Sequence, residues 1–424
     1  MPFNPTHRPG RAPSQPGKTA TSGPAPQAAS LLLSGAVDAR RQGRNNEALG
    51  LARQALELDG DNLAALSLAG EILLTAGRKA DAEPLLARAH QQKPGDAVLA
   101  HMYGVALYQM DKPAKAAEIL ARAAAADPGN ALVHSALGAA LQKIDRLEEA
   151  MAAHRRAAAI DPGNADIQVN VASAALRLAG WTEAAEATAR ALSLNPVHRR
   201  ALAYRAIALT ELGQRDAAAA ILDYDRLVRI IDFADTDAGG DLAGLNAALA
   251  AHVERHPGLT FEPVLKATTG GSQTPDLLAG KRGPVARLET MVRREIGRYI
   301  ADADPARHPY LGHAPSDYRL VMWGTYLTSQ GRQAPHIHPG AWLSGVYYPA
   351  LPPEMGPGAG RHDGWIEFGR GGDEFPASAE PVLRLFEPRE GRLLLFPSFM
   401  FHRTYPFESA APRVSIALDV EPSR

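Results

Sequence analysis

Two closely spaced histidines in the last quarter of the chain are the residues whose types and spacing best suit chemistry. His336 and His338 lie two residues apart within "QAPHIHPGAWLSGVYYPA", a stretch that is typical of a strand. Side chains alternate between the two faces of a strand, so both imidazoles are expected on one face. His402 closes a further apolar run, "LLLFPSFMFH". Because the chain contains no Cys, any metal site in it must use His, Asp or Glu.

An arginine that follows His402 by eleven residues adds a second kind of chemistry. In the predicted strand 413–420, one face carries Arg413, Ser415, Ala417 and Asp419, and the other carries Val414, Ile416, Leu418 and Val420. An arginine that points with a serine into the interior of a sheet requires an anionic partner, because an unpaired buried charge is very costly.

Short apolar runs separated by Gly, Pro and Asp make up the chain from Tyr318 onward, and such runs are typical of strands. Six or more of them in succession predict an antiparallel sandwich or jelly roll. Trp342, Tyr347 and Tyr348 are expected to form core or pocket wall. The expected strands are 318–327, 342–351, 364–370, 382–388, 391–398 and 413–420.

The segment 232–316 is predicted to be a linker with helices that support these strands. A helical pattern starts at about Ala243, and apolar residues at helical spacing predict an amphipathic helix over 284–303. The polar segment 267–283 between them is predicted to be a loop.

The first half of the chain repeats itself every 34 residues. Small residues recur at fixed places, which lets two antiparallel helices approach each other closely. The recurring positions are Ala48, Ala82, Ala116, Ala150, Ala184 and Ala218, then Ala55, Ala89, Ala123, Ala157 and Ala191, and finally Pro94, Pro128, Pro162 and Pro196.

This periodicity resembles the tetratricopeptide repeat. The resemblance covers Ala29 to about Val228, as five clear repeats and a degenerate sixth, and it implies an α-solenoid domain over 29–231. Such repeats stack into a superhelix whose concave face binds peptides or protein segments. The alternative is that the array is only a spacer or a dimerisation arm.

The strand region resembles the iron- and 2-oxoglutarate-dependent dioxygenases of the prolyl-hydroxylase-like branch. Gly331 and Pro335 precede His336 as they do in that branch. The stretches "HPGAWLSGVYYP" and "FPSFMFH" are similar to a bacterial and phage subfamily with the pattern H-x-H…SGVYY…FPS…H…R. The resemblance implies a double-stranded β-helix over 317–424 that uses Fe(II), 2-oxoglutarate and dioxygen to hydroxylate a carbon.

The same resemblance assigns roles to residues of the site. It places His336 and His402 on the iron, and Arg413 with Ser415 on the far carboxylate of 2-oxoglutarate. Gln333 occupies a position where relatives place a polar group near 2-oxoglutarate.

The third iron ligand is where the chain departs from the family pattern. The usual site has two histidines and one carboxylate, but here His338 stands at the carboxylate position. Three outcomes are open: a three-histidine site, a site completed by another acid such as Glu367, or a site without metal. A neutral third ligand leaves the iron more positive, which favours an anionic co-substrate but weakens metal retention.

Composition excludes several functions. The net charge of −1 excludes nucleic-acid binding as the main theme. No apolar run approaches the ~20 residues that a membrane span needs, and the absence of Cys is compatible with a cytoplasmic protein. Residues 1–28 are rich in Pro, Gly, Ser and Thr, lack the apolar segment of a signal peptide, and are predicted to be a disordered tail.

Three functions are compatible with this organisation. In the first, the protein is a dioxygenase that hydroxylates a protein or peptide recruited by the repeats. In its rival, the protein is a non-enzymatic adaptor whose β domain is a degenerate cupin, and the missing carboxylate favours this alternative. In the third, it is an oxygenase of a small metabolite or glycan that uses its repeats only for assembly.

Overall fold

The structure is a computed structural model that describes residues 24–263, 266–355 and 362–423, in two compact units within Met1–Pro128 and Gly129–Arg424. Most of the tail predicted over 1–28 lies outside the described residues, but helix α1 begins at Pro24, so the last five residues of that segment are helical. Within the described part of the chain, no helix combines the length and the apolar character that crossing a membrane requires.

The first unit consists of three antiparallel helix pairs. Asn62 and Asp96 precede the first helix of successive pairs, and their side chains accept hydrogen bonds from backbone N–H groups of the first turn. Gly70 leaves room for Leu86 of the paired helix, since a Cβ at Gly70 would lie 2.6 Å from that side chain. The helices are α1 (Pro24–Arg41), α2 (Asn45–Leu58), α3 (Leu63–Thr75), α4 (Lys79–Gln92), α5 (Ala97–Gln109) and α6 (Pro113–Ala126).

The second unit begins with three further pairs of the same repeat. The predicted helical array is confirmed as far as Leu227 for the described residues, and its recurring alanines are buried. The helices are α7 (Ala131–Lys143), α8 (Leu147–Ile160), α9 (Ala165–Arg177), α10 (Trp181–Leu194), α11 (Arg199–Glu211), α12 (Arg215–Leu222) and the short α13 (Tyr224–Leu227).

A seven-stranded antiparallel sheet follows, in the order β1-β8-β5-β10-β4-β3-β2. Its central strand β10 pairs with β4 and β5, which places Asp419 opposite Val321 on one side and Ser344 on the other. The strands are β1 (Arg229–Asp232), β2 (Thr260–Phe261), β3 (Thr268–Gln273), β4 (Tyr318–Gln333), β5 (Leu343–Ala350), β8 (Arg392–Pro397) and β10 (Arg413–Pro422).

A second antiparallel sheet contains β7 (Arg384–Phe386), β6 (Ile366–Phe368) and β9 (His402–Thr404) in that order. Phe368 of β6 contacts Phe396 of β8, with ring centroids 4.8 Å apart, so the two sheets share one core. The predicted antiparallel strand region is therefore confirmed.

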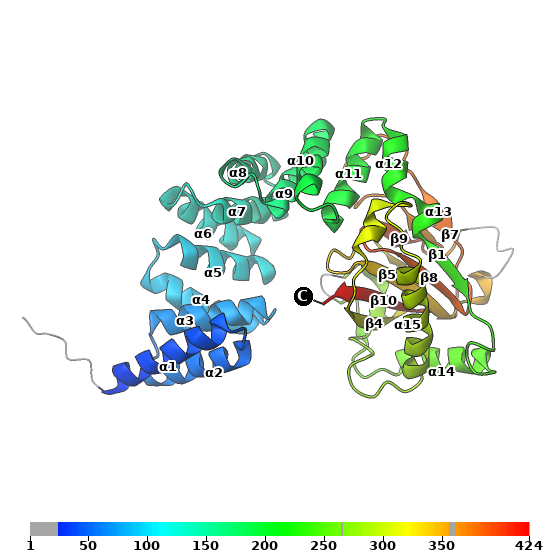
Figure 1. Ribbon diagram of the computed structural model, residues 1–424, viewed down its shortest axis with the longest axis horizontal. Coiled ribbons are helices and arrows are strands. Elements are labelled where there is room, and N and C mark those ends of the chain that lie inside the picture. The colour runs from blue at the N-terminus through cyan, green and yellow to red at the C-terminus, as the bar shows by residue number, and fades with distance from the viewer. Residues whose placement is uncertain (1–23, 264–265, 356–361, 424) are drawn as a thin grey trace, which may run out of the picture. The chain divides into compact units, whose positions relative to one another are not determined.

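Two helices pack on the large sheet (Figure 1). Their apolar side chains and those of one face of β10 complete this core. Helix α14 (Leu242–Glu254) lies against β4, β5 and β10, and α15 (Val285–Ala301) contributes its apolar side to the same cluster. The alternation predicted for β10 holds, since Val414, Ile416, Leu418 and Val420 all belong to this cluster. Two 3₁₀ turns, η1 (Pro309–His313) and η2 (Pro353–Met355), flank β4 and β5.

Four of the described strands lie outside the ranges expected from the sequence, namely β1, β2, β3 and β9. Strand β3 lies in the segment predicted to be a loop, because β4 runs on to Gln333 and its backbone pairs with a polar segment that offers no apolar pattern of its own. Strand β1 begins at Arg229, inside the range 29–231 assigned to the repeats, because its backbone extends the large sheet beyond β8.

The last repeats pack directly on the strand region. Ile337, between the two closely spaced histidines, and Phe401, next to His402, insert into a hydrophobic cluster with residues of α8 to α11. Arg199 of α11 donates a hydrogen bond of 2.9 Å to the carbonyl of Ala341. The loop between β4 and β5, which bears two of the histidines, is therefore supported by repeat helices.

Candidate functional site

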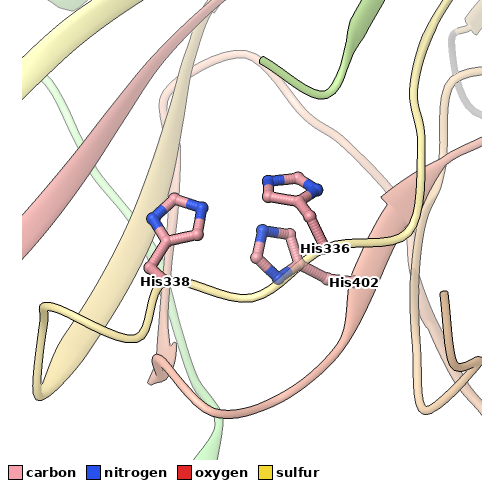
Figure 2. Close-up of side chains that lie close together, drawn as sticks. All are labelled: His336, His338 and His402. Atoms are coloured by element: carbon pink, nitrogen blue, oxygen red, sulfur yellow. The ribbon is translucent and has the colours of Figure 1, made fainter. Parts of the chain in front are cut away.

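The three predicted histidines converge (Figure 2). One ring nitrogen from each of His336, His338 and His402 lies within 4.8 Å of the others, and in the described part of the chain no other group of this kind could hold a metal. His336 and His338 come from the loop between β4 and β5, whereas His402 begins β9. The backbones of His336 and His402 exchange two hydrogen bonds of 3.0 Å, which fixes the spacing between the two segments.

Hydrogen bonds set the tautomer of all three rings. The Nδ1 atoms of His336 and His402 donate to the carbonyls two residues earlier, Ala334 at 2.8 Å and Met400 at 3.0 Å. The Nδ1 atom of His338 faces the carboxylate of Asp419 at 2.8 and 2.9 Å. Since these partners only accept hydrogen bonds, the proton lies on Nδ1 in each ring and the lone pair on Nε2 is free to bind a metal.

Burial keeps two of the imidazoles neutral. It lowers the pKa of His336 to about 3, with a further contribution from the nearby His338. Burial and the two neighbouring imidazoles also lower the pKa of His402 well below its usual value. Neutral imidazole is the form that binds metals, so these two rings need not lose a proton on binding at neutral pH.

Asp419 lies directly behind His338. Its carboxylate also accepts a hydrogen bond of 2.6 Å from the hydroxyl of Ser344, a side chain that is 1% exposed. Sequence reasoning placed Asp419 on the face of Arg413 but gave it no role. The signal that could have found it is this shared face, which points from β10 toward the histidines.

Arg413 is a fully buried guanidinium without an anionic partner among the described residues. It is 1% exposed, and no described residue forms a hydrogen bond with its Nε. Its neighbours are the hydroxyl of Ser415 at 3.4 Å and the ring of Tyr348, whose centroid lies 5.1 Å from the guanidinium carbon. Burial lowers the pKa of Arg413, but an arginine stays charged in proteins. Arg413 is thus buried beside Ser415, while the anionic partner that the sequence argument requires is not found among the described residues.

Arg413 and the three histidines line one narrow cavity of about 20 Å³. Ser415 and Gln333, both named from the sequence, also line it. So do Thr325 and Tyr348, whose hydroxyls have no hydrogen-bond partner within the described part of the chain. Sequence reasoning missed Thr325, which pairs with Ser415 across β4 and β10. Two free hydroxyls and an unpaired guanidinium make this cavity suitable for a small anion.

Glu367 does not join the histidines. Its carboxylate is fully buried and accepts hydrogen bonds from Arg370 at 2.8 Å, Arg403 at 2.7 Å and Tyr405 at 2.6 Å. Burial raises the pKa of Glu367, but these hydrogen bonds outweigh it, and the pKa lies below the usual value. Alternation along β6 explains the arrangement, because the next residue, Phe368, is the one that faces His402, with ring centroids 5.8 Å apart.

An open groove of about 410 Å³ adjoins the cavity. Trp323, Gln333, His336 and His338 line both spaces, so the cavity and the groove share a wall that contains two of the histidines. Lys266, Pro339, Gly340 and Glu421 form part of the outer wall. A molecule in this groove would lie next to a metal held by the histidines.

Comparison with known families agrees with this division of the chain. Residues 321–419 match a family described as "Putative 2OG-Fe(II) oxygenase", and the match contains all the residues of the cavity. Residues 33–97 and 73–141 match two models of the tetratricopeptide repeat. None of the curated proteins matches the chain.

Similar solved structures include "YrrB: a TPR protein with an unusual peptide-binding site", which is 24% identical, covers 41% of this chain and 90% of its own, and has a TM-score of 0.37. MamA from Desulfovibrio magneticus RS-1 is 21% identical over 41% of this chain and 97% of its own, with a TM-score of 0.37. The type IV pilus biogenesis factor PilW is 20% identical over 46% of this chain and 91% of its own, with a TM-score of 0.43. The chain is thus similar to tetratricopeptide-repeat proteins over residues 33–141 and to the 2-oxoglutarate- and Fe(II)-dependent oxygenase family over residues 321–419.

Proposed function

We propose that the protein is a 2-oxoglutarate- and Fe(II)-dependent oxygenase whose two sheets form a double-stranded β-helix. The observation that carries the proposal is the buried, unpaired guanidinium of Arg413 in the same cavity as three converging histidines. A carboxylate of 2-oxoglutarate would supply the anion that Arg413 lacks. The family match over residues 321–419 supports this assignment.

The donor set fits iron. His336, His338 and His402 would hold it through Nε2, because their Nδ1 atoms are engaged elsewhere, and imidazole is a suitable ligand for iron. When bound, Fe(II) supplies the activation of dioxygen, so that 2-oxoglutarate, dioxygen and a substrate C–H group become succinate, carbon dioxide and a C–OH group.

The chain's own side chains bind and orient the co-substrate. The planar guanidinium of Arg413 suits two-point contact with a carboxylate, and the hydroxyls of Ser415, Thr325 and Tyr348 are available as further donors. The present cavity holds only about one water molecule. Entry of 2-oxoglutarate therefore requires the half-buried Trp323 and Gln333 at its mouth to move.

The substrate would occupy the outer groove, and we infer that it is a protein or peptide segment recruited by the repeats. The groove has the size of an ordinary ligand pocket. One wall of the groove is the loop that contains Ile337, and this side chain packs against the repeat helices α8 to α11. A peptide held by these repeats would therefore lie near the groove. A small metabolite would not need this connection.

Calorimetric titration of 2-oxoglutarate tests the proposal. The protein is loaded with Mn(II), and oxygen is excluded so that no turnover occurs. We expect saturable binding that depends on the metal, and release of succinate once Fe(II) and oxygen are supplied. Absence of heat at millimolar 2-oxoglutarate would exclude the oxygenase and favour the non-enzymatic adaptor.

A further inference from the structure

The site contains a carboxylate, but it does not occupy the ligand position that the family pattern gives to an acid. It contacts the far side of the imidazole that stands at that position. Asp419 contacts the Nδ1 side of His338 with both of its oxygens, at 2.8 and 2.9 Å, and is held by Ser344 at 2.6 Å. His338 itself stands where the usual site has its carboxylate ligand. The anion is therefore in contact with the third imidazole and not with the metal position.

Other acids near the site are already engaged. Glu367 is bound by Arg370 and Arg403, and Glu421, two residues after Asp419 on the same face of β10, forms an ion pair with Arg319 at 2.7 Å. Asp419 has no basic partner other than His338 among the described residues. Its charge is consequently directed at the ring that would bind the metal.

We propose that Asp419 is a positioning residue that takes the place of the missing carboxylate ligand, acting on the metal through His338. This inference rests on the proposed function only for the identity of the metal, and it goes beyond it by assigning the charge of the site. A carboxylate behind a ligating imidazole fixes the tautomer and the ring orientation and makes Nε2 a stronger donor. It would also strengthen the binding of a divalent cation by three neutral ligands.

The two other histidines provide an internal comparison. Backbone carbonyls orient His336 and His402, and such partners cannot be removed by substitution of a side chain. His338 is the ring whose partner is a side-chain carboxylate, supplied from a different segment of the chain and held by a buried hydroxyl. The sheet register places Asp419 opposite Ser344, so this arrangement is built into the pairing of β5 and β10.

Metal affinity of the full chain is the first test. Asp419→Asn keeps the size of the side chain and removes its charge, and we expect the affinity for Fe(II) or Mn(II) alone to fall by about 10–100-fold. Glu421→Gln is the matched control, since it removes the same charge from the same face of the same strand without touching His338. We expect Glu421→Gln to leave the affinity within about twofold of the parent, because interactions of an exposed ion pair are weak.

The tautomer of His338 gives a readout that a merely structural role would not change. An asparagine can donate to Nδ1 as well as accept from it, so it no longer dictates which ring nitrogen is protonated. Nitrogen NMR of the metal-free protein with labelled histidine should show His338 protonated on Nδ1 in the parent and a mixture of tautomers in Asp419→Asn. Ser344→Ala should give a smaller loss of metal affinity that disappears in the Asp419→Asn background, because both act through the same carboxylate.

The outcomes separate this inference from the proposed function. If the parent binds neither Fe(II) nor Mn(II), the proposed function fails. If the parent binds metal and Asp419→Asn binds it equally well, with His338 still protonated on Nδ1, the role of Asp419 is wrong while the oxygenase assignment stands. Equal losses of metal affinity in Asp419→Asn and Glu421→Gln would also contradict the role of Asp419. Such losses would show that the metal responds to the net negative charge on this face of β10 and not to the contact with His338.

Discussion

Removal of the guanidinium of Arg413 tests the anion site at the level of a single residue. Arg413→Ala should weaken binding of 2-oxoglutarate by at least about tenfold, since loss of one partner of a buried charge pair costs on the order of 2–5 kcal/mol and each ~1.4 kcal/mol is one decade. Arg413→Lys should rescue poorly, because an ammonium group lacks the planar fork. Anaerobic calorimetry with Mn(II) measures both variants.

Arg392→Lys provides the control for that experiment. Arg392 is a second buried arginine of the large sheet, but it is paired with Asp232 at 2.6 and 2.7 Å and does not line the cavity. Unchanged affinity in Arg392→Lys together with a loss in Arg413→Ala would locate the effect in the cavity. An equal loss in both would point to general destabilisation of the sheet.

Glu367 separates a ligand from a structural carboxylate. Glu367→Gln should leave the affinity for Fe(II) unchanged, since its carboxylate is engaged with two arginines and a tyrosine. It should lower the free energy of unfolding by about 2 kcal/mol through the loss of charge-assisted hydrogen bonds. Metal titration and urea unfolding check the two expectations, and a variant that kept its stability but lost iron would restore Glu367 as a ligand.

The site residues were predictable to different degrees. Arg413 follows from the period of two along a strand, which needs no tertiary information. The strand expected at His336 and His338 is wrong, because β4 ends at Gln333, and the two rings converge from the loop that follows it. The functions of Asp419 and Thr325 depend on the register between strands far apart in sequence, which a single chain does not reveal. Glu367 was left open as a ligand because alternation alone does not say which face of a short strand is the inner one.

At the scale of elements, the helix pair α7–α8 contains a buried histidine whose protonation would destabilise it. His154 of α8 packs on Gly138, where the two preceding repeats have Leu120 on Gly104 and Leu86 on Gly70. It is fully buried, and neither of its ring nitrogens has a hydrogen-bond partner among the residues that the structure describes. Burial lowers the pKa of His154 to about 4.

This histidine should make stability depend on pH. The unfolded chain takes up the proton near pH ~6.5 and the folded chain only near 4. Stability present above about pH 6.5 is therefore lost as the pH falls toward 4, by on the order of 3 kcal/mol. His154→Leu should raise the unfolding temperature and remove the part of the slope that His154 contributes, leaving the part due to the buried His336 and His402. His313→Leu, at an exposed position, should leave the slope unchanged. An unchanged slope in His154→Leu would contradict the assignment.

The elements themselves were predictable where periodicity is strong. Recurring alanines and capping residues determine the helix pairs. Alternation along the strand supports β4 and β10, whereas continuous apolar runs determine β5 and β8. Strand β3 could not be found because Thr, Gly and Ser carry no apolar pattern, and its conformation comes from pairing with β4. Short strands such as β1 and β9 have too few residues to establish a period.

At the scale of the whole molecule, the last repeats belong structurally to the site. Ile337 lies between His336 and His338, and Phe401 precedes His402. Both side chains pack against helices α8 to α11, so these helices support the backbone that carries the histidines. Sequence reasoning treated the repeats and the strands as separate domains. The compact unit that contains the site starts at Gly129 and includes three helix pairs.

Truncation distinguishes these two descriptions. A chain of residues 129–424 should fold and bind Fe(II) with the affinity of the full protein, because it keeps the helices that contact Ile337 and Phe401. A chain of residues 229–424 retains every strand and every candidate ligand, yet it should bind iron poorly, because an unsupported loop no longer holds two of the three imidazoles. Ile337→Ala in the full chain guards against simple misfolding of the fragment, and it should weaken metal binding by up to about tenfold without abolishing the fold. Metal titration and circular dichroism measure all three. If residues 229–424 bound iron as tightly as the full chain, the strand region would be self-sufficient and the repeats would serve recruitment alone.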